Sequence, residues 1–358
     1  MKVLITGICG FVGCVLVEFF RRQRQGMSIA GIDNLSRRGS ELNIPKLKEL
    51  DVNFFYGDLR EVQDLDILPA VDWVIDCAAN PSVLAGTGDE GSPAQLVGHN
   101  LRSTLNLLEF CRKHGAGLIM LSTSRVYSIS QLNALPLCVS GNRFELAIDE
   151  TANKISGLSA RGIAETFSTT PPLSLYGATK LSSEIMASEY GSFFSFPLWV
   201  NRCGTLAGPG QFGRVDQGIL SYWIYNYLLE KPLKYIGYGG EGFQVRDFLH
   251  PDDLASLILK QMGQTSESSK PKIINIGGGL ARSCSLAELT DWCNRRGKVK
   301  KTISSEPDNR LFDMPYYVTD TTLAAEVWKW RPETSLDDIL ESTWTWAEKN
   351  IEKIRLFA

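Results

Sequence analysis

The sequence predicts an α/β fold, in which a doubly wound parallel sheet of the Rossmann type is followed by a smaller C-terminal lobe. In the first half, short apolar runs alternate with helical patterns, which is typical of βαβ units. These runs are almost continuously apolar, as expected for strands covered on both faces. After Gly204 the loops become rich in glycine and aromatic residues. We therefore expect a sheet domain over 1–200, to which part of 215–255 returns, and a second lobe over 201–358.

The predicted elements follow the chain in order. The expected strands are Val3–Ile5, Ile29–Asp33, Asn53–Tyr56, Trp73–Ala78, Leu118–Ser122 and Leu198–Arg202. The expected helices are Phe11–Gln25, Leu59–Leu68, Ala94–His114, Ser174–Glu189, Gln217–Glu230, Pro251–Met262, Leu286–Arg295 and Ser335–Ile351. The segment 264–272 reads as a solvated loop. The connection 128–174 is long for a compact domain, and we expect it to form a lid or an oligomer contact.

Composition excludes several classes of function. The chain has 358 residues and a formal net charge of −3, which gives no basic footprint for nucleic acid. The start, MKVLITG, reads as a strand entering a turn and not as a signal peptide. No apolar stretch reaches membrane-spanning length. The eight cysteines form no C-x-x-C pair, and the three histidines give little material for a metal site. We expect a cytoplasmic protein that binds no metal, membrane or nucleic acid.

A glycine motif, TGICGFVG, lies between the first strand and the first helix. Gly7 allows the tight turn, Gly10 lets the backbone approach a pyrophosphate, and Gly13 lets the helix pack closely on the sheet. Phe11 and Val12 lie between these glycines. The free N–H groups of the helix then face the anion. This context predicts a dinucleotide-binding turn.

The end of the second strand indicates which dinucleotide binds. Asp33 follows Gly13 by 20 residues, where a carboxylate would hold the ribose hydroxyls. The same charge would repel a 2′-phosphate and favours NAD over NADP, although Arg37 and Arg38 lie near enough to support a phosphate. Asp58 and Leu59 follow the third strand and are expected near the adenine, with a helix N-cap as the alternative for Asp58.

Tyr176 and Lys180 form a Y-x-x-x-K pair on a predicted helix, where the spacing places both side chains on one face. A free phenol has a pKa of about 10, too high for a base at neutral pH. A nearby ammonium is expected to lower that pKa. The pair therefore suits moving a hydroxyl proton while a hydride goes to NAD. Ala78 and Ala79 end the fourth strand, where small residues admit a flat cofactor.

The chain resembles the extended short-chain dehydrogenases/reductases, the family of NAD-dependent nucleotide-sugar epimerases and dehydratases. The resemblance rests on the glycine motif at 6–13, S-T-x-x-V-Y at 122–127, Asn100, Tyr176 with Lys180, and R-D-x-x-H-x-x-D at 246–253. It implies an enzyme that keeps NAD bound, oxidises a sugar carbon and returns the hydride. The loops at 33–37, 211–218, 244–247 and 275–278 are most similar to CDP-tyvelose (CDP-paratose) 2-epimerases.

The resemblance also implies roles for single residues. Tyr176 is the base, Lys180 its partner and a ribose ligand, and Thr123 relays the proton of the reacting hydroxyl. The dehydratases of the family place Asp-Glu where this chain has Ser124 and Arg125. Arginine stays protonated, so this argues against elimination of water. Asp33 likewise argues against reduction by NADPH.

The remaining predicted site residues are assigned by ligand. The cofactor set is completed by Asn34, Asn100, Ser122 and Cys203. The expected substrate ligands are Ser82, Thr123, Ser124, Arg125, Gln211, Phe212, Gln217, Arg246 and Arg310. Arg246 and Arg310 suit a diphosphate because guanidinium binds phosphate bidentately, and a surface ion pair is the alternative for each. Core packing is the alternative for Phe212.

The leading functional prediction is a nucleotide-sugar epimerase most like CDP-paratose 2-epimerase, acting on a CDP- or UDP-linked sugar. A UDP-hexose 4-epimerase is the close rival. A 4,6-dehydratase and a non-catalytic NAD-binding sensor remain as weaker alternatives. The family implies a homodimer formed through helices within 94–114 and 174–190.

Overall fold

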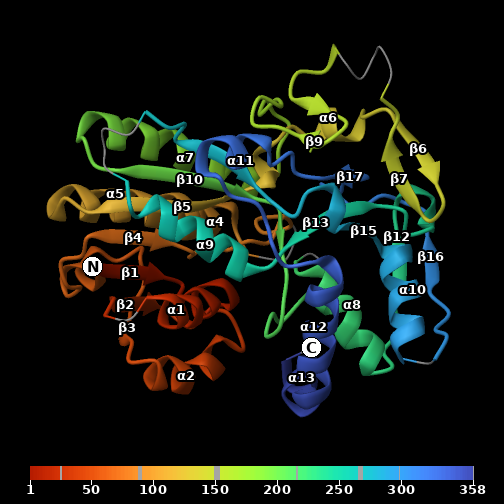
Figure 1. The fold of residues 1–358 in the computed structure, drawn as a ribbon, viewed down its shortest axis with the longest axis horizontal. Coiled ribbons are helices and arrows are strands. Elements are labelled where there is room, and N and C mark those ends of the chain that lie inside the picture. Colours follow the sequence, from red (N-terminus) through yellow and green to blue (C-terminus); the bar gives the residue numbers. More distant parts are fainter. Residues whose placement is uncertain are drawn as a thin grey trace.

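A computed structural model describes residues 1–24, 26–87, 91–148, 154–214, 217–264, 269–297 and 299–357. Its centre is a seven-stranded parallel sheet in the order β14-β10-β5-β4-β1-β2-β3 (Figure 1). The strands are β1 Lys2–Thr6, β2 Ser28–Asp33, β3 Asn53–Tyr56, β4 Trp73–Asp76, β5 Gly117–Thr123, β10 Leu198–Cys203 and β14 Ile273–Ile276. The predicted α/β fold class is confirmed.

Both faces of this sheet are buried, which explains why its strands are apolar throughout. In β1, Val3 and Ile5 join the core on one face, and Leu4 joins the core on the other. Helices α1, α9 and α11 cover the first face, and α3, α5 and α7 cover the second. These helices are α1 Phe11–Gln23, α9 Pro251–Gln261, α11 Thr322–Trp328, α3 Val62–Asp66, α5 Ser103–His114 and α7 Leu175–Phe193.

The sheet is completed by segments from the second half of the chain. β14 pairs with β10, and α9 packs against α1. The segments that return to the sheet domain thus include the start of α9, within the expected 215–255, and the later strand β14 at 273–276. The predicted helix over 94–114 begins as α4 Pro93–Val97 and passes through a π-helical turn at 98–102 into α5. Residues 265–268 of the expected solvated loop lie outside the described residues.

The C-terminal lobe has its own small sheets and helices. Its strands are β11 Thr205–Leu206, β12 Lys234–Ile236, β13 Val245–Leu249, β15 Ser283–Ser285, β16 Ser304–Glu306 and β17 Tyr316–Tyr317. Its helices are α8 Ile219–Leu228, α10 Leu286–Gly297, α12 Leu336–Lys349 and α13 Ile351–Phe357. Trp223 and Trp344 are buried in the core that these helices share. In the described part of the chain, no helix is long and apolar enough to cross a membrane.

The long connection 128–174 packs against the C-terminal lobe. It contains α6 Ile129–Asn133 and the strand pairs β6 Leu137–Ser140 with β7 Arg143–Leu146, and β8 Leu158–Ser159 with β9 Gly162–Ile163. Arg143 donates to the Ser283 hydroxyl at 2.6 Å, and the Phe144 N–H donates to the Phe243 carbonyl at 2.9 Å. The first hairpin therefore belongs to the wall of this lobe. Residues 149–153 lie outside the described residues.

Candidate active site

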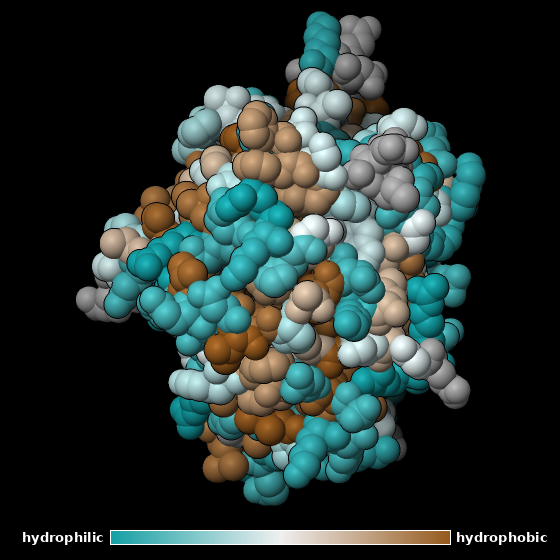
Figure 2. All heavy atoms as spheres, turned by 90° about the vertical axis from the view of Figure 1, so that its left-hand side faces the viewer, coloured by the Kyte–Doolittle hydropathy of each residue, from teal (hydrophilic) through white to brown (hydrophobic). Residues whose placement is uncertain are grey.

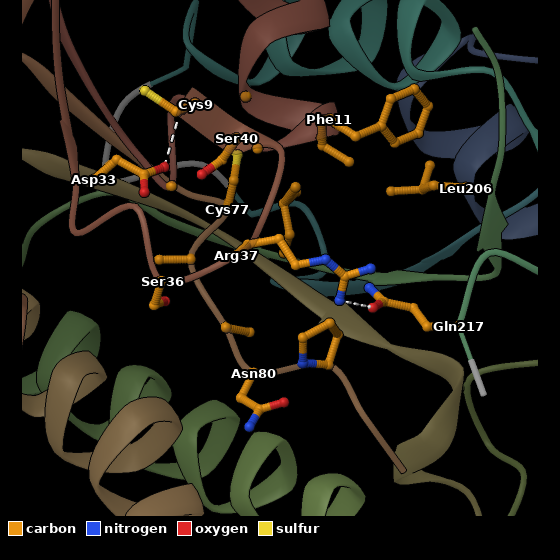
Figure 3. Close-up of a pocket in the computed structure, with 18 of the residues that line it drawn as sticks. Cys9, Phe11, Asp33, Ser36, Arg37, Ser40, Cys77, Asn80, Leu206 and Gln217 are labelled. Carbon is orange, nitrogen blue, oxygen red and sulfur yellow. Dashed lines mark hydrogen bonds between the residues drawn. The ribbon is translucent and has the colours of Figure 1, made fainter. Parts of the chain in front are cut away.

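A cavity of about 650 Å³ opens at the carboxyl ends of the central strands, between the sheet and the C-terminal lobe (Figure 3). Most of the predicted site residues line it. They are Gly7, Gly10, Phe11, Val12, Gly13, Asp33, Asn34, Arg37, Asp58, Leu59, Ala78, Ala79, Ser122, Thr123, Ser124, Arg125, Tyr176, Cys203, Gln211, Phe212 and Gln217. Five predicted residues lie outside this lining, which are Ser82, Asn100, Lys180, Arg246 and Arg310. Asp216, which belongs to the resemblance at 211–218, lies outside the described residues.

The glycine turn has the geometry that its sequence predicts. Gly7 has a φ of +59°, in the left-handed region that favours glycine. A Cβ at Gly13 would lie 2.6 Å from the Gly7 carbonyl oxygen, so no larger residue fits without moving the backbone. Gly10 is the N-cap of α1 and has no side chain to occupy the helix N-terminus. The turn therefore forms a cradle that brings backbone N–H groups close to a pyrophosphate.

Asp33 lines the cavity beside the glycine turn. Its carboxylate accepts hydrogen bonds from the Cys9 N–H at 3.0 Å and the Leu35 N–H at 2.8 Å. Burial raises the pKa of Asp33, and these hydrogen bonds oppose that shift. Arg37 extends across the cavity and donates to Gln217 of the C-terminal lobe at 2.5 Å (Figure 3). Arg38 donates to the Leu356 carbonyl at 2.7 Å. Arg37 and Arg38, the two arginines expected near enough to support a phosphate, are thus both directed toward the C-terminal lobe.

Asp58 lies at the rim of the same region. It accepts from Arg60 Nη2 at 2.7 Å and from Asn34 at 3.0 Å, and the hydrogen bonds from Arg60 hold its pKa well below the usual range. Helix α3 begins at Val62, with Glu61 as its N-cap. The alternative that Asp58 is a helix N-cap is therefore wrong.

The predicted catalytic residues meet at the end of β5. Thr123 is the last residue of the strand, and Tyr176 lies in the first turn of α7, which Ser174 caps through the Gly177 N–H at 3.0 Å. Burial raises the pKa of Tyr176 to about 12, while a hydrogen bond with Thr123 and the charge of Arg125 lower it. Thr123 and Tyr176 thus form a hydroxyl pair facing the cavity.

Lys180 lies behind this pair and is buried. Its charge opposes the rise that burial causes in the pKa of Asp76, and it acts in the same way on Cys203. The expected lowering of the Tyr176 pKa by Lys180 is therefore not seen, because burial of the phenol dominates and the ammonium acts on Asp76. The predicted contact of Lys180 with a ribose stays a prediction.

A buried ion pair joins α7 to β10, and it was not predicted from the sequence. Ser122 donates to Glu184 at 2.5 Å, and Arg202 of β10 binds the same carboxylate with Nη2 at 2.7 Å and Nε at 3.0 Å. The Ser122 hydroxyl is thus engaged by Glu184, and the predicted contact of Ser122 with the cofactor stays a prediction. Tyr176, Lys180 and Glu184 are spaced four residues apart. This spacing would have placed Glu184 on the same helix face as the other two. No sequence signal connects it to Arg202, which lies in a buried strand.

Asn100 has a structural role within the described residues. It lies in the π-helical turn, where it donates to the Thr179 hydroxyl at 3.0 Å and accepts from the Asn80 N–H at 2.8 Å. Several further residues of the cavity wall were not predicted from the sequence. Those labelled in Figure 3 are Cys9, Ser36, Ser40, Cys77, Asn80 and Leu206. Most of these residues could have been found from the sequence only because they lie close to the predicted motifs.

A second cavity of about 160 Å³ adjoins the first and is lined by Arg125, Arg246 and Arg310. Gln217 and Thr205 line both cavities. Arg246 donates to Asp313 at 3.1 Å and to the Met314 carbonyl at 2.7 Å, and burial lowers its pKa. This cavity therefore offers several guanidinium groups where the sequence predicts a diphosphate.

The chain matches the model of the NAD dependent epimerase/dehydratase family over residues 3–277. The chain belongs to this family. The predicted resemblance is thereby confirmed, and so are the predictions that the chain is an enzyme and that NAD is its cofactor. The glycine cradle and the carboxylate of Asp33 are groups of this family member that suit NAD.

Individual relatives cover almost the whole chain. It is 28% identical to the CDP-paratose 2-epimerase of Salmonella typhi, over 97% of this chain and 99% of the relative. It is 29% identical to the UDP-glucuronate 4-epimerase of Thermodesulfobacterium geofontis, over 98% of each. The structure superposes on that of a UDP-glucuronic acid 4-epimerase from Bacillus cereus, solved with UDP-glucuronic acid and NAD, with a TM-score of 0.76 at 26% identity. That comparison covers 98% of this chain and 99% of the other.

Proposed function

We propose that this family member is a nucleotide-sugar epimerase that oxidises a sugar carbon transiently and returns the hydride to the opposite face. The observation that carries the proposal is the position of the Thr123–Tyr176 pair in the wall of the first cavity. Arg125, two residues after Thr123, lines both cavities. A ligand extending from one cavity into the other passes this pair. The arrangement suits a sugar at the cofactor and a nucleoside diphosphate beyond it.

The residues of the pair divide the proton transfer between them. Tyr176 takes the proton of the reacting hydroxyl, and Thr123, which is hydrogen-bonded to the phenol, relays it. NAD supplies the hydride acceptor when bound. Ser124 and Arg125 stand where elimination of water needs a carboxylic acid and a carboxylate. The structure keeps both residues in the cavity wall. This supports epimerisation over dehydration.

The sugar and the base of the substrate have two candidates. The loops at 33–37 and 211–218 favour a CDP-linked 3,6-dideoxyhexose inverted at carbon 2. The similarity to a UDP-glucuronate 4-epimerase, at 29% identity, supports a UDP-linked hexose inverted at carbon 4. A thermal-shift series with CDP, UDP, GDP and dTDP separates the bases, because the preferred ligand stabilises the folded state most.

Replacement of Tyr176 by phenylalanine tests the mechanism. We expect Tyr176→Phe to lose at least about 100-fold in kcat while it keeps its bound NAD, because only the proton acceptor is removed. Tyr190→Phe is the matched control, since Tyr190 lies on the same helix and its hydroxyl donates to Glu109 at 2.9 Å near the surface. Full turnover by Tyr176→Phe would exclude Tyr176 as the base.

We further propose that the protein is a cytoplasmic homodimer. Helices α5 and α7 pack against each other, and Ile185 of α7 is 57% exposed. An apolar side chain at this position supports a contact with a second copy of the chain. All eight cysteines are free, which supports a reducing compartment.

A further inference from the structure

Arg125 lies where the two cavities meet. It follows Thr123 by two residues and is one of the few residues that line both cavities. Its backbone N–H donates to the Thr123 hydroxyl at 3.2 Å, and its carbonyl lies against Gly177, next to the catalytic Tyr176. The backbone of Arg125 is therefore fixed by its contacts with Thr123 and with the helix that carries Tyr176.

The guanidinium of Arg125 has no carboxylate partner in the described part of the chain. No acidic oxygen of those residues lies within 4.0 Å of it, and its one side-chain hydrogen bond goes from Nη1 to the Phe312 carbonyl at 2.9 Å. Asp313, the acid whose charge acts on it, is already paired with Arg246 at 3.1 Å. Burial and the charge of Arg246 lower its pKa to about 10, so the group stays charged at neutral pH.

A half-buried cation that lacks a counter-ion is costly for the folded protein, because it loses part of its hydration. Tyr176 and Thr123 lie on one side of it, and Arg246 and Arg310 lie on the other. On the proposed function, the groups that pass this point belong to the sugar and to the phosphate that carries it. Guanidinium presents two parallel N–H donors, which match the two oxygens of a phosphate or a carboxylate.

We propose that Arg125 binds an anionic oxygen pair of the substrate at the junction of the two cavities. The inference rests on the proposed function. Two sources provide this chemistry, which are the phosphate attached to the sugar and a carboxylate on the sugar ring. Arg125 is then a substrate-binding residue that favours substrates with an anionic group at this point. By its position it also excludes dehydratase chemistry.

Binding measurements that need no turnover give the first test. Isothermal titration compares UDP with UMP, and CDP with CMP, on the NAD-loaded wild type, Arg125→Met and Arg125→Gln. If Arg125 holds the sugar-linked phosphate, both variants lose about 10- to 100-fold in affinity for the diphosphates and little for the monophosphates. Arg161→Met is the control, since Arg161 is 69% exposed and outside both cavities.

Kinetics with two sugars give the second test. If the anion is a sugar carboxylate, the variants lose about 10- to 100-fold more kcat/KM for UDP-glucuronate than for UDP-glucose, because the loss of charge beside Tyr176 affects both sugars alike. Glutamine retains an N–H donor for the Phe312 carbonyl and lacks the charge. Wild-type affinity and kinetics in Arg125→Gln would therefore assign the side chain to the Phe312 contact and overturn the proposal.

The melting temperature and bound NAD of each variant show whether it is folded, and the glutamine variant provides the test where methionine does not fold. The two proposals fail separately. A wild type that turns over no nucleotide sugar, yet binds UDP through Arg125, contradicts the epimerase and leaves this inference in place. If the wild type epimerises neutral and acidic sugars no better than Arg125→Gln does, that result contradicts this inference alone.

Discussion

At the scale of single residues, the proposed activity depends most on the charged and polar groups around Tyr176. Burial raises the pKa of the phenol to about 12, and only the phenolate accepts a proton. Thr123 and Arg125 are the neighbours that oppose this rise. The value of kcat/KM should therefore increase with pH up to the pKa of Tyr176. Removing the side chain of Thr123 or Arg125 should move that rise to higher pH.

Thr123→Val tests this directly, because valine keeps the shape of threonine and removes the hydroxyl. We expect kcat/KM to fall by about 10- to 100-fold at neutral pH and its acid limb to move to higher pH, since the phenolate loses a hydrogen bond. The pH profile of kcat/KM is the measurement. An acid limb at the same pH as in the wild type would show that Thr123 does not stabilise the phenolate.

At the scale of elements, the apolar strands and the glycine turn were predictable because their signals are local. The predicted Asn53–Tyr56 coincides with β3, and the predicted Pro251–Met262 differs from α9 by one residue. The position of β14 beside β10 was not predictable, since a strand of four residues carries no partner information. The same holds for the contact of Glu184 with Arg202, because it joins a helix to a strand only after both have packed. The direction of Arg37 toward Gln217 likewise depends on how the lobes meet.

Glu184→Gln tests the buried ion pair that joins α7 to β10. The change leaves the Arg202 guanidinium buried without its counter-ion, so we expect the free energy of unfolding to fall by about 3–5 kcal/mol. Urea unfolding followed by circular dichroism is the measurement. Glu189→Gln, exposed on the same helix, should change it by less than about 0.5 kcal/mol. Equal stabilities of the two variants would show that the pair is not a support of the catalytic helix.

At the scale of the whole molecule, the site depends on two lobes that contact each other across the two cavities. Arg37 reaches Gln217, and Arg125 reaches Phe312. The face that Figure 2 shows, on the left of Figure 1 where α5 and α7 lie, carries hydrophobic atoms in brown among hydrophilic atoms in teal. Phe193, at the end of α7, is 82% exposed.

Ile185→Arg tests the proposed dimer. An arginine in the centre of an apolar helix contact would leave a charge without a partner, so we expect sedimentation velocity to show monomers where the wild type is a dimer. The substitution is on the surface and should leave the melting temperature of the monomer nearly unchanged. A wild type that sediments as a monomer, or a variant that remains a dimer, would exclude this contact.

The return of the same hydride is the central claim, and isotope tracing tests it most directly. The NAD-loaded protein is incubated with a nucleotide sugar that carries deuterium on the carbon to be inverted. We predict that the epimer forms with the deuterium on that same carbon, without exchange with water and without accumulation of NADH. Loss of deuterium to water, or release of a keto sugar together with NADH, would contradict the account.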